Sequence, residues 1–310
     1  MKATSSKPIR LKARGTSFWE NRNVAGYLFI SPWLIGFLIF TLIPMLMSLY
    51  YSFTNYKLGM DHQFVGLQNY INLFQNDPKF VVSMKNTLIY VVTSVPLRLL
   101  FALIIALLFT YKTKIEGLYR AVYYLPSLIG GSVAIAVLWK RLFASDGILN
   151  ALLALVGVEV STNWLGNPST SLWTLVLLAA WQFGSPMLIF LAALKQIPSE
   201  LYEAAKVDGA NKVQSFFRIT LPMLTPIIFF NLVMQMITAF TIFTQSYVIS
   251  GGTGAPLDSL LLYSLYLYRR AFVFFDMGYA SAMAWILVII ISIFTAIAFG
   301  SKKLWVYSED

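Results

Sequence analysis

A stripe of polar side chains interrupts the apolar stretch between residues 226 and 249. Amides and hydroxyls recur there three or four residues apart, which places them along one face of a helix. Both groups donate and accept hydrogen bonds, so they can replace the water around a polar solute. They can equally join neighbouring membrane helices, and the spacing leaves both roles open. The stripe consists of Asn231, Gln235, Thr238, Thr241 and Gln245.

A second candidate group lies between residues 172 and 194, where Gly184, Ser185 and Pro186 interrupt an apolar run. Such a break can expose backbone carbonyls within a membrane. Trp181, just before the break, is most simply a packing or interface aromatic, and a place beside a solute path is the alternative.

Arg98 is the one charge in the apolar run from 87 to 111. An unpaired charge is costly there. We favour a side chain that reaches the membrane surface or bonds to helix carbonyls. The alternative is that Arg98 attracts an anionic substrate.

Several kinds of reactive site are missing from the sequence. It has no cysteine, one histidine (His62) and no G-x-x-x-x-G-K-[ST] loop, so we expect any ATP to be bound by another protein. No acidic residue falls inside a predicted span, which counts against ion-coupled transport, although backbone carbonyls can bind sodium. We expect no enzymatic activity, cofactor or metal on this chain.

The composition indicates an integral membrane protein. Hydrophobic residues make up 58% of the 310 residues and charged residues 12%, which excludes a soluble enzyme. Stretches with little or no charge predict six spanning helices, because lipid offers no partner for bare peptide groups. The first run is too long for a signal peptide and lacks a cleavage site. The spans are predicted near 25–50, 87–111, 121–138, 172–194, 226–249 and 280–300.

The net charge of +10 is explained by membrane topology. Basic residues are retained on the cytoplasmic side, and they are most numerous in the N-terminal tail and the segments assigned to that side. We therefore expect both termini in the cytoplasm, with residues 1–24 as a basic tail. The segments near 51–86, 145–171 and 250–279 are predicted as outer loops.

The segment between the fourth and fifth spans predicts a helix-turn-helix. Ser199 can cap the first helix, and Glu200 favours its positive end. Gly209 supplies the left-handed residue that ends this helix, and Asn211 can start the second one.

Residues 197–222 resemble the EAA loop of binding-protein-dependent ABC importer permeases, with every spacing of that motif matched. In that family the loop docks into a cleft on the ATP-binding subunit. The small residues of the first helix would keep it thin enough to enter a groove. The resemblance assigns coupling to Glu203, Ala204, Ala205, Gly209, Ile219, Leu221 and Pro222.

Three shorter stretches resemble the carbohydrate branch of the family, and specifically its first maltose-type or glycerol-phosphate-type subunit. They are residues 31–37 with Pro44, residues 64–70 and residues 275–282. The likeness extends from about residue 25 onward. The maltose member has extra N-terminal spans and a large outer domain that this sequence lacks, so contacts of that domain are not carried over.

The resemblance implies an all-α membrane protein with the type I ABC importer permease fold, in which a first helix (25–50) precedes a five-helix core (85–303). It implies a subunit of an ATP-driven importer of di- or oligosaccharides in the bacterial cytoplasmic membrane. The implied partners are a second homologous permease, two ATPase subunits that bind ATP and magnesium, and an extracytoplasmic solute-binding protein, with no nucleic acid.

In the family, the helix that corresponds to the fifth span lines the translocation cavity. The resemblance therefore favours a path role for Gln235, Thr238 and Thr241. For Asn231 and Gln245 the helix-joining role is equally favoured.

Three alternatives remain open. The same mechanism could import glycerol phosphate or an acidic oligosaccharide. A secondary sugar transporter would work without an ATPase and has no use for the loop pattern. A regulatory membrane scaffold would keep the loop but need no polar stripe.

Overall fold

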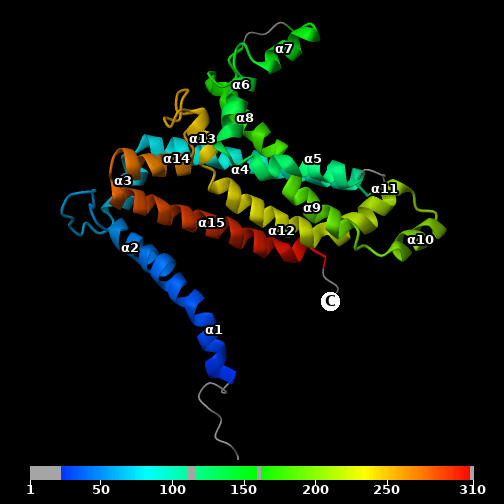
Figure 1. The fold of residues 1–310 in the computed structure, drawn as a ribbon, viewed down its shortest axis with the longest axis horizontal. Coiled ribbons are helices and arrows are strands. Elements are labelled where there is room, and N and C mark those ends of the chain that lie inside the picture. The colour runs from blue at the N-terminus through cyan, green and yellow to red at the C-terminus, as the bar shows by residue number, and fades with distance from the viewer. Residues whose placement is uncertain (1–21, 111–115, 159–161, 308–310) are drawn as a thin grey trace, which may run out of the picture. The chain divides into compact units, whose positions relative to one another are not determined.

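The computed structural model describes residues 22–110, 116–158 and 162–307, and these are predominantly helical (Figure 1). Among them, the only extended pairing is an isolated antiparallel bridge between Thr54 and Phe64. The chain divides into two compact units, Met1–Tyr50 and Tyr51–Asp310. The predicted basic tail lies outside the described residues as far as residue 21.

The described part of the first unit is a single apolar helical stretch that continues to Ser52. A π-helical turn, η2 (Leu38–Leu42), joins α1 (Arg22–Phe37) to α2 (Ile43–Ser52). Pro44 explains the wider turn, because its ring clashes with the carbonyl four residues earlier. The stretch from Gly26 to Ser52 is long and apolar enough to cross a membrane.

The second unit contains the remaining helices. In chain order they are α3 (Gln68–Gln75), α4 (Pro78–Leu108), α5 (Glu116–Ile129), α6 (Val133–Leu142), α7 (Ile148–Leu155), α8 (Pro168–Trp181), α9 (Gly184–Leu194), α10 (Ser199–Val207), α11 (Lys212–Ser215), η3 (Phe216–Thr220), α12 (Leu221–Phe240), α13 (Thr244–Ile249), α14 (Tyr263–Tyr268), η4 (Arg269–Val273) and α15 (Met277–Trp305).

Among the described residues, five helical stretches have the length and composition of membrane spans, and the bent pair α5 and α6 makes a sixth if it counts as one. The prediction of one continuous helix over 121–138 was wrong. The two axes differ by 100°. Gly130 and Gly131 interrupt the helix, and Ser132 caps the next one by accepting a bond from the Ile135 amide at 3.3 Å.

The outer segments contain more structure than predicted. Helices α3, α7 and α14 lie in stretches predicted as loops. Helix α4 begins well before residue 87, because Asp77 caps it by accepting bonds from the amides of Lys79 and Phe80, both at 3.1 Å. Residues Leu260–Tyr263 are fully buried, so part of the last predicted outer loop belongs to the core.

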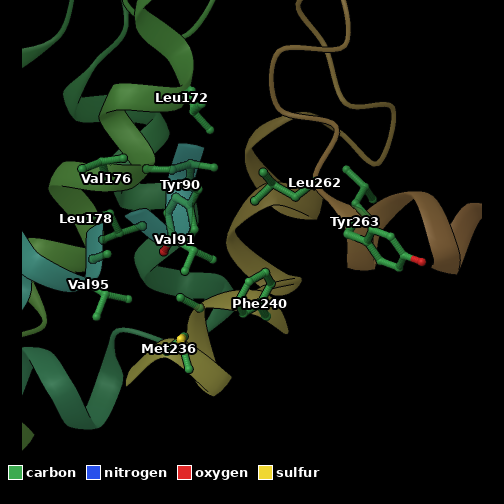
Figure 2. Close-up of a cluster of buried hydrophobic side chains, with 14 of the residues drawn as sticks. Tyr90, Val91, Val95, Leu172, Val176, Leu178, Met236, Phe240, Leu262 and Tyr263 are labelled. Carbon is green, nitrogen blue, oxygen red and sulfur yellow. The ribbon is translucent and has the colours of Figure 1, made fainter. Parts of the chain in front are cut away.

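Helix α4 is the centre of the second unit, where it contacts α8, α9, α12 and α14. Figure 2 shows part of this core, with side chains of α4 between those of α8 and α12. Close packing, rather than hydrophobicity, holds helices together in lipid. The buried side chains labelled there are Tyr90, Val91, Val95, Leu172, Val176, Leu178, Met236, Phe240, Leu262 and Tyr263.

Candidate functional site

Three helix breaks meet beside α4. Helix α5 ends before Gly130, α8 ends before Gln182, and α12 ends before Thr241. The Gly130 carbonyl accepts bonds from two side-chain amides, that of Gln182 at 3.0 Å and that of Gln245 at 3.1 Å. One backbone oxygen therefore joins all three breaks.

The break between α8 and α9 also frees a carbonyl, at Gln182. The Nε of Arg98 donates to this oxygen at 2.8 Å, and the hydroxyl of Ser127 donates to it at 2.9 Å. The Ser185 amide donates in turn to the Ser127 hydroxyl at 3.0 Å. The break thus lies at Gln182–Phe183, just before the predicted Gly184-Ser185-Pro186, and Arg98 bonds to a helix carbonyl as favoured from the sequence.

A cavity of about 240 Å³ lies at this junction. It brings together five of the residues predicted to line a substrate path. They are Arg98, Gln235, Thr238, Thr241 and Gln245. Other polar lining residues are Tyr90, Ser94, Gln182 and Thr244.

The stripe side chains on α12 and at its C-terminal end differ in their hydrogen bonding. Thr238 donates to the Met234 carbonyl at 2.8 Å, and Thr241 donates to the Ile237 carbonyl at 3.1 Å. A hydroxyl that donates to its own helix keeps acceptor capacity for a solute. The Gln235 Oε1 is buried and, among the described residues, has no hydrogen-bond partner.

Four predicted path residues do not line the cavity. Asn231 is fully buried in α12, where its amide donates to the Ile227 carbonyl at 3.2 Å. Gly184 begins α9 where α5 crosses, and an added Cβ would lie 2.6 Å from the Tyr123 carbonyl oxygen. Ser185 follows it, and Trp181 packs against Trp139, with ring centroids 6.0 Å apart. Their placement indicates helix packing.

Sequence reasoning missed two central residues of the site. Gly130 fell inside a predicted spanning helix, although its pairing with Gly131 was a turn signal. Gln182, which follows Trp181 directly, was not predicted as a path residue. Its roles depend on α4 and α5, which are distant in the chain.

The predicted helix-turn-helix is present between α9 and α12. Gly209 has φ of +79° and ends α10 in a Schellman arrangement, in which the Ala210 amide donates to Ala205 at 2.8 Å and the Gly209 amide donates to Lys206 at 3.1 Å. The predicted cap at Ser199 was wrong. Pro198 precedes the helix, and Ser199 is its first residue without a side-chain cap.

The second helix starts as predicted. Asn211 and Gln214 form a capping box, each side chain accepting from the other's backbone amide, at 2.9 and 2.8 Å. The helix then continues through η3 into α12, so one helical stretch runs from Lys212 towards the cavity. Pro222 explains the π-turn η3 as Pro44 explains η2.

The predicted coupling residues lie along this helix-turn-helix. Glu203, Ala204 and Gly209 are exposed, whereas Ala205, Ile219, Leu221 and Pro222 are partly buried. Large apolar side chains are also exposed here, including Val207 (88%) and Val213 (64%).

A separate polar cluster joins the ends of α4, α14 and α15. Asp77 is 7% exposed, and its Oδ2 accepts bonds from the hydroxyls of Tyr266 at 2.5 Å and Tyr279 at 2.6 Å and from Arg270 at 2.7 Å. Burial alone would raise the pKa of the Asp77 carboxyl. The hydrogen bonds outweigh it and hold this pKa below the usual value.

Comparison with known proteins gives the family. Residues 67–305 match the model of the "Binding-protein-dependent transport system inner membrane component" family. The chain belongs to this family. It is 56% identical over 93% of both chains to the "Probable ABC transporter permease protein YesP" of Bacillus subtilis (strain 168).

Two further similarities extend along nearly the whole chain. The lactose transport system permease protein LacF of Rhizobium radiobacter is 34% identical, over 91% of this chain and 95% of LacF. Among solved structures, a chain of a bacterial alginate ABC transporter matches with a TM-score of 0.79 at 24% identity, over 92% of this chain and 96% of that one. This last similarity establishes the fold of the permease.

Proposed function

We propose that this family member is one of two membrane subunits of an ATP-driven importer of di- or oligosaccharides. One observation carries the proposal. A single helical stretch starts as the second helix of the exposed helix-turn-helix and reaches the polar cavity near its other end. This arrangement connects a docking surface for an energy source to a path for a polar solute. The carbohydrate class is supported by relatives such as the lactose permease.

The cavity supplies the groups that a sugar needs. A saccharide that leaves water must exchange its hydrogen bonds for others. Gln235, Thr238, Thr241 and Gln245 offer amides and hydroxyls for that exchange. At about 240 Å³ the cavity holds only part of an oligosaccharide, and a second, homologous permease subunit completes the path.

The helix-turn-helix docks on the ATPase subunit. Its exposed side chains include Glu203, which offers a charge, and Val207, which offers apolar surface. Two ATPase subunits bind ATP with magnesium, and their closure pulls on this loop and turns the cavity outward. An extracytoplasmic binding protein then delivers the sugar, and hydrolysis resets the path.

The proposed location is the bacterial cytoplasmic membrane, with both chain termini in the cytoplasm. The charge distribution supports this orientation. It also puts the helix-turn-helix on the side where ATP is available and the Asp77 cluster on the opposite side.

Reconstitution tests the proposal. Proteoliposomes with both permeases, the ATPase and the binding protein should take up saccharide only with ATP, and vanadate should stop uptake. Glu203→Lys should weaken retention of the ATPase in a pull-down, mostly at low salt if an ion pair is lost. Uptake without the ATPase would support a secondary transporter, and ATPase binding without any uptake would support a scaffold.

A further inference from the structure

The cavity contains one charged side chain, Arg98, and no carboxylate among its lining residues. Within the part of the chain that the structure describes, Arg98 makes one hydrogen bond, from Nε to the Gln182 carbonyl at 2.8 Å, and no ion pair. The N–H groups of its two Nη nitrogens therefore have no hydrogen-bond acceptor among the described residues. A cation without a counter-ion lies at the point where a solute would bind.

The position of Arg98 within the membrane span makes its uncompensated positive charge costly. The residue lies well inside α4, a span of high hydropathy, where a charge is strongly disfavoured. Its side chain reaches the break at Gln182 instead of the membrane surface, so snorkelling does not relieve the cost. A carbonyl dipole compensates a full charge only in part, and a neutral glutamine would make the same bond more cheaply.

The direction of the guanidinium suits one kind of ligand. The Nε bond fixes the plane of the group and leaves the two Nη donors as a fork. A carboxylate accepts two parallel bonds from such a fork. Since no second cation lines the cavity, a monoanion is balanced whereas a phosphate dianion is not.

We propose that this cavity takes a saccharide that carries a carboxylate, such as a uronate, and that Arg98 is the residue that selects it. The inference rests on the proposed importer function. Arg98 binds the carboxylate through both Nη atoms. The hydroxyls of Thr238 and Thr241, which donate to carbonyls of their own helix, accept hydrogen bonds from the sugar hydroxyls.

The test compares two nearly isosteric ligands on the assembled transporter in nanodiscs, trapped with vanadate and free of binding protein. The probes are a labelled uronic acid disaccharide and its methyl ester. We expect the acid to bind at least about tenfold more tightly, which corresponds to one charge-assisted pair. In Arg98→Gln the two affinities should become equal, and Arg98→Lys should keep part of the preference.

Arg141→Gln is the matched control, because Arg141 pairs with Asp146 at an exposed site away from the cavity. It should keep the full preference for the acid. Equal binding of acid and ester by the unmodified transporter, which requires no variant, would overturn the proposal. So would a preference that survives in Arg98→Gln, or tight binding of glycerol phosphate in place of the uronate.

Loss of both ligands in Arg98→Gln, with a lower melting temperature, would show that Arg98 only holds the helix break. That result would also overturn the proposal. A different measurement tests the importer function itself. If no saccharide, neutral or acidic, is taken up with ATP, the importer function is wrong. Uptake of neutral sugars without preference for the acid would reject the Arg98 inference alone.

Discussion

The hydroxyls of Tyr202 and Thr220 lie 2.8 Å apart and hydrogen-bond to each other. Tyr202 is on α10 and Thr220 is at the end of η3, immediately before α12. In the proposed mechanism, a displacement of α10 by the ATPase would act on the base of the helix that carries Gln235 and Thr238. This bond joins the first helix of the predicted coupling loop to the base of the helix that leads to the cavity.

Gly209→Val should uncouple transport from ATP hydrolysis. Gly209 has φ of +79°, which costs an ordinary residue about 1–2 kcal/mol and a β-branched one more. No atom lies within 4 Å of an added Cβ, so the strain comes from the backbone alone. The measurement is ATPase activity stimulated by the binding protein, which should fall while the subunit still inserts.

Gly209→Asn is the matched variant, because asparagine tolerates the left-handed conformation. It should retain most of the coupling. Normal transport by the valine variant would contradict the assignment of this loop to coupling.

Gln235→Leu combined with Thr238→Leu should abolish sugar uptake and leave assembly and basal ATP hydrolysis near normal. Both side chains line the cavity, and each lost hydrogen-bonding group costs transport about 1 kcal/mol or more. Uptake and the melting temperature of the purified complex are measured together.

Asn231→Leu is the control for that pair, since Asn231 is on the same helix but buried outside the cavity. Uptake per surviving complex should be unchanged in this variant. A helix-joining role for Gln235 and Thr238 would instead lower stability, with uptake proportional to the complex that survives.

Gly130→Ala should open the junction of the helix breaks. An added Cβ would overlap the Gln182 side chain and lie 2.5 Å from the Pro126 carbonyl oxygen, and overpacking of this kind costs about 1–3 kcal/mol. The next residue, Gly131, has no atom within 4 Å of an added Cβ. Thermal unfolding of the complex should distinguish Gly130→Ala from an almost unchanged Gly131→Ala, and equal melting temperatures would contradict the role of Gly130.

The Asp77 cluster predicts a loss of stability in acid. Because the pKa of Asp77 is lower in the folded protein than in the unfolded one, its stabilisation is present above the unfolded pKa, near 4, and is lost as pH falls through the folded pKa. Asp77→Asn should cost about 2 kcal/mol at pH 7, since Arg270 is partly exposed, and should remove this acid dependence.

Thermal unfolding between pH 7 and pH 3 measures both effects. Asp146→Asn is the control, since its ion pair with Arg141 is exposed and contributes little. An Asp77→Asn profile parallel to that of the unmodified protein would show that another group causes the acid sensitivity.

Much of the architecture could be predicted because lipid imposes simple rules. Runs with little or no charge located the spans. Four stripe residues line one cavity as predicted, although the helix breaks after Phe240, so Gln235 and Thr238 are on α12, Thr241 follows its end and Gln245 is on α13. The Gly209 turn and the Asn211 cap could be predicted since both are local. A turn or helix cap that depends on residues within one helical turn can often be predicted from a single sequence.

Two of the failures come from dependence on distant partners. Leu260–Tyr263 looked like an outer loop because Asp258 and Arg269 flank it, yet Thr87 on α4 accepts a bond from the Tyr263 amide at 2.8 Å and draws the segment inward. Gln182 gains its role from Gly130 and Arg98 on other helices. No local pattern encodes such contacts.

The paired hydrogen bonds at the helix breaks have a consequence for ion coordination. A carbonyl oxygen has two lone pairs, and both those of Gly130 and those of Gln182 are already taken by side-chain donors. Neither oxygen can ligate a sodium ion without first releasing a donor. At these two breaks the carbonyls, which in many ion-coupled carriers serve as cation ligands, are instead occupied in joining helices.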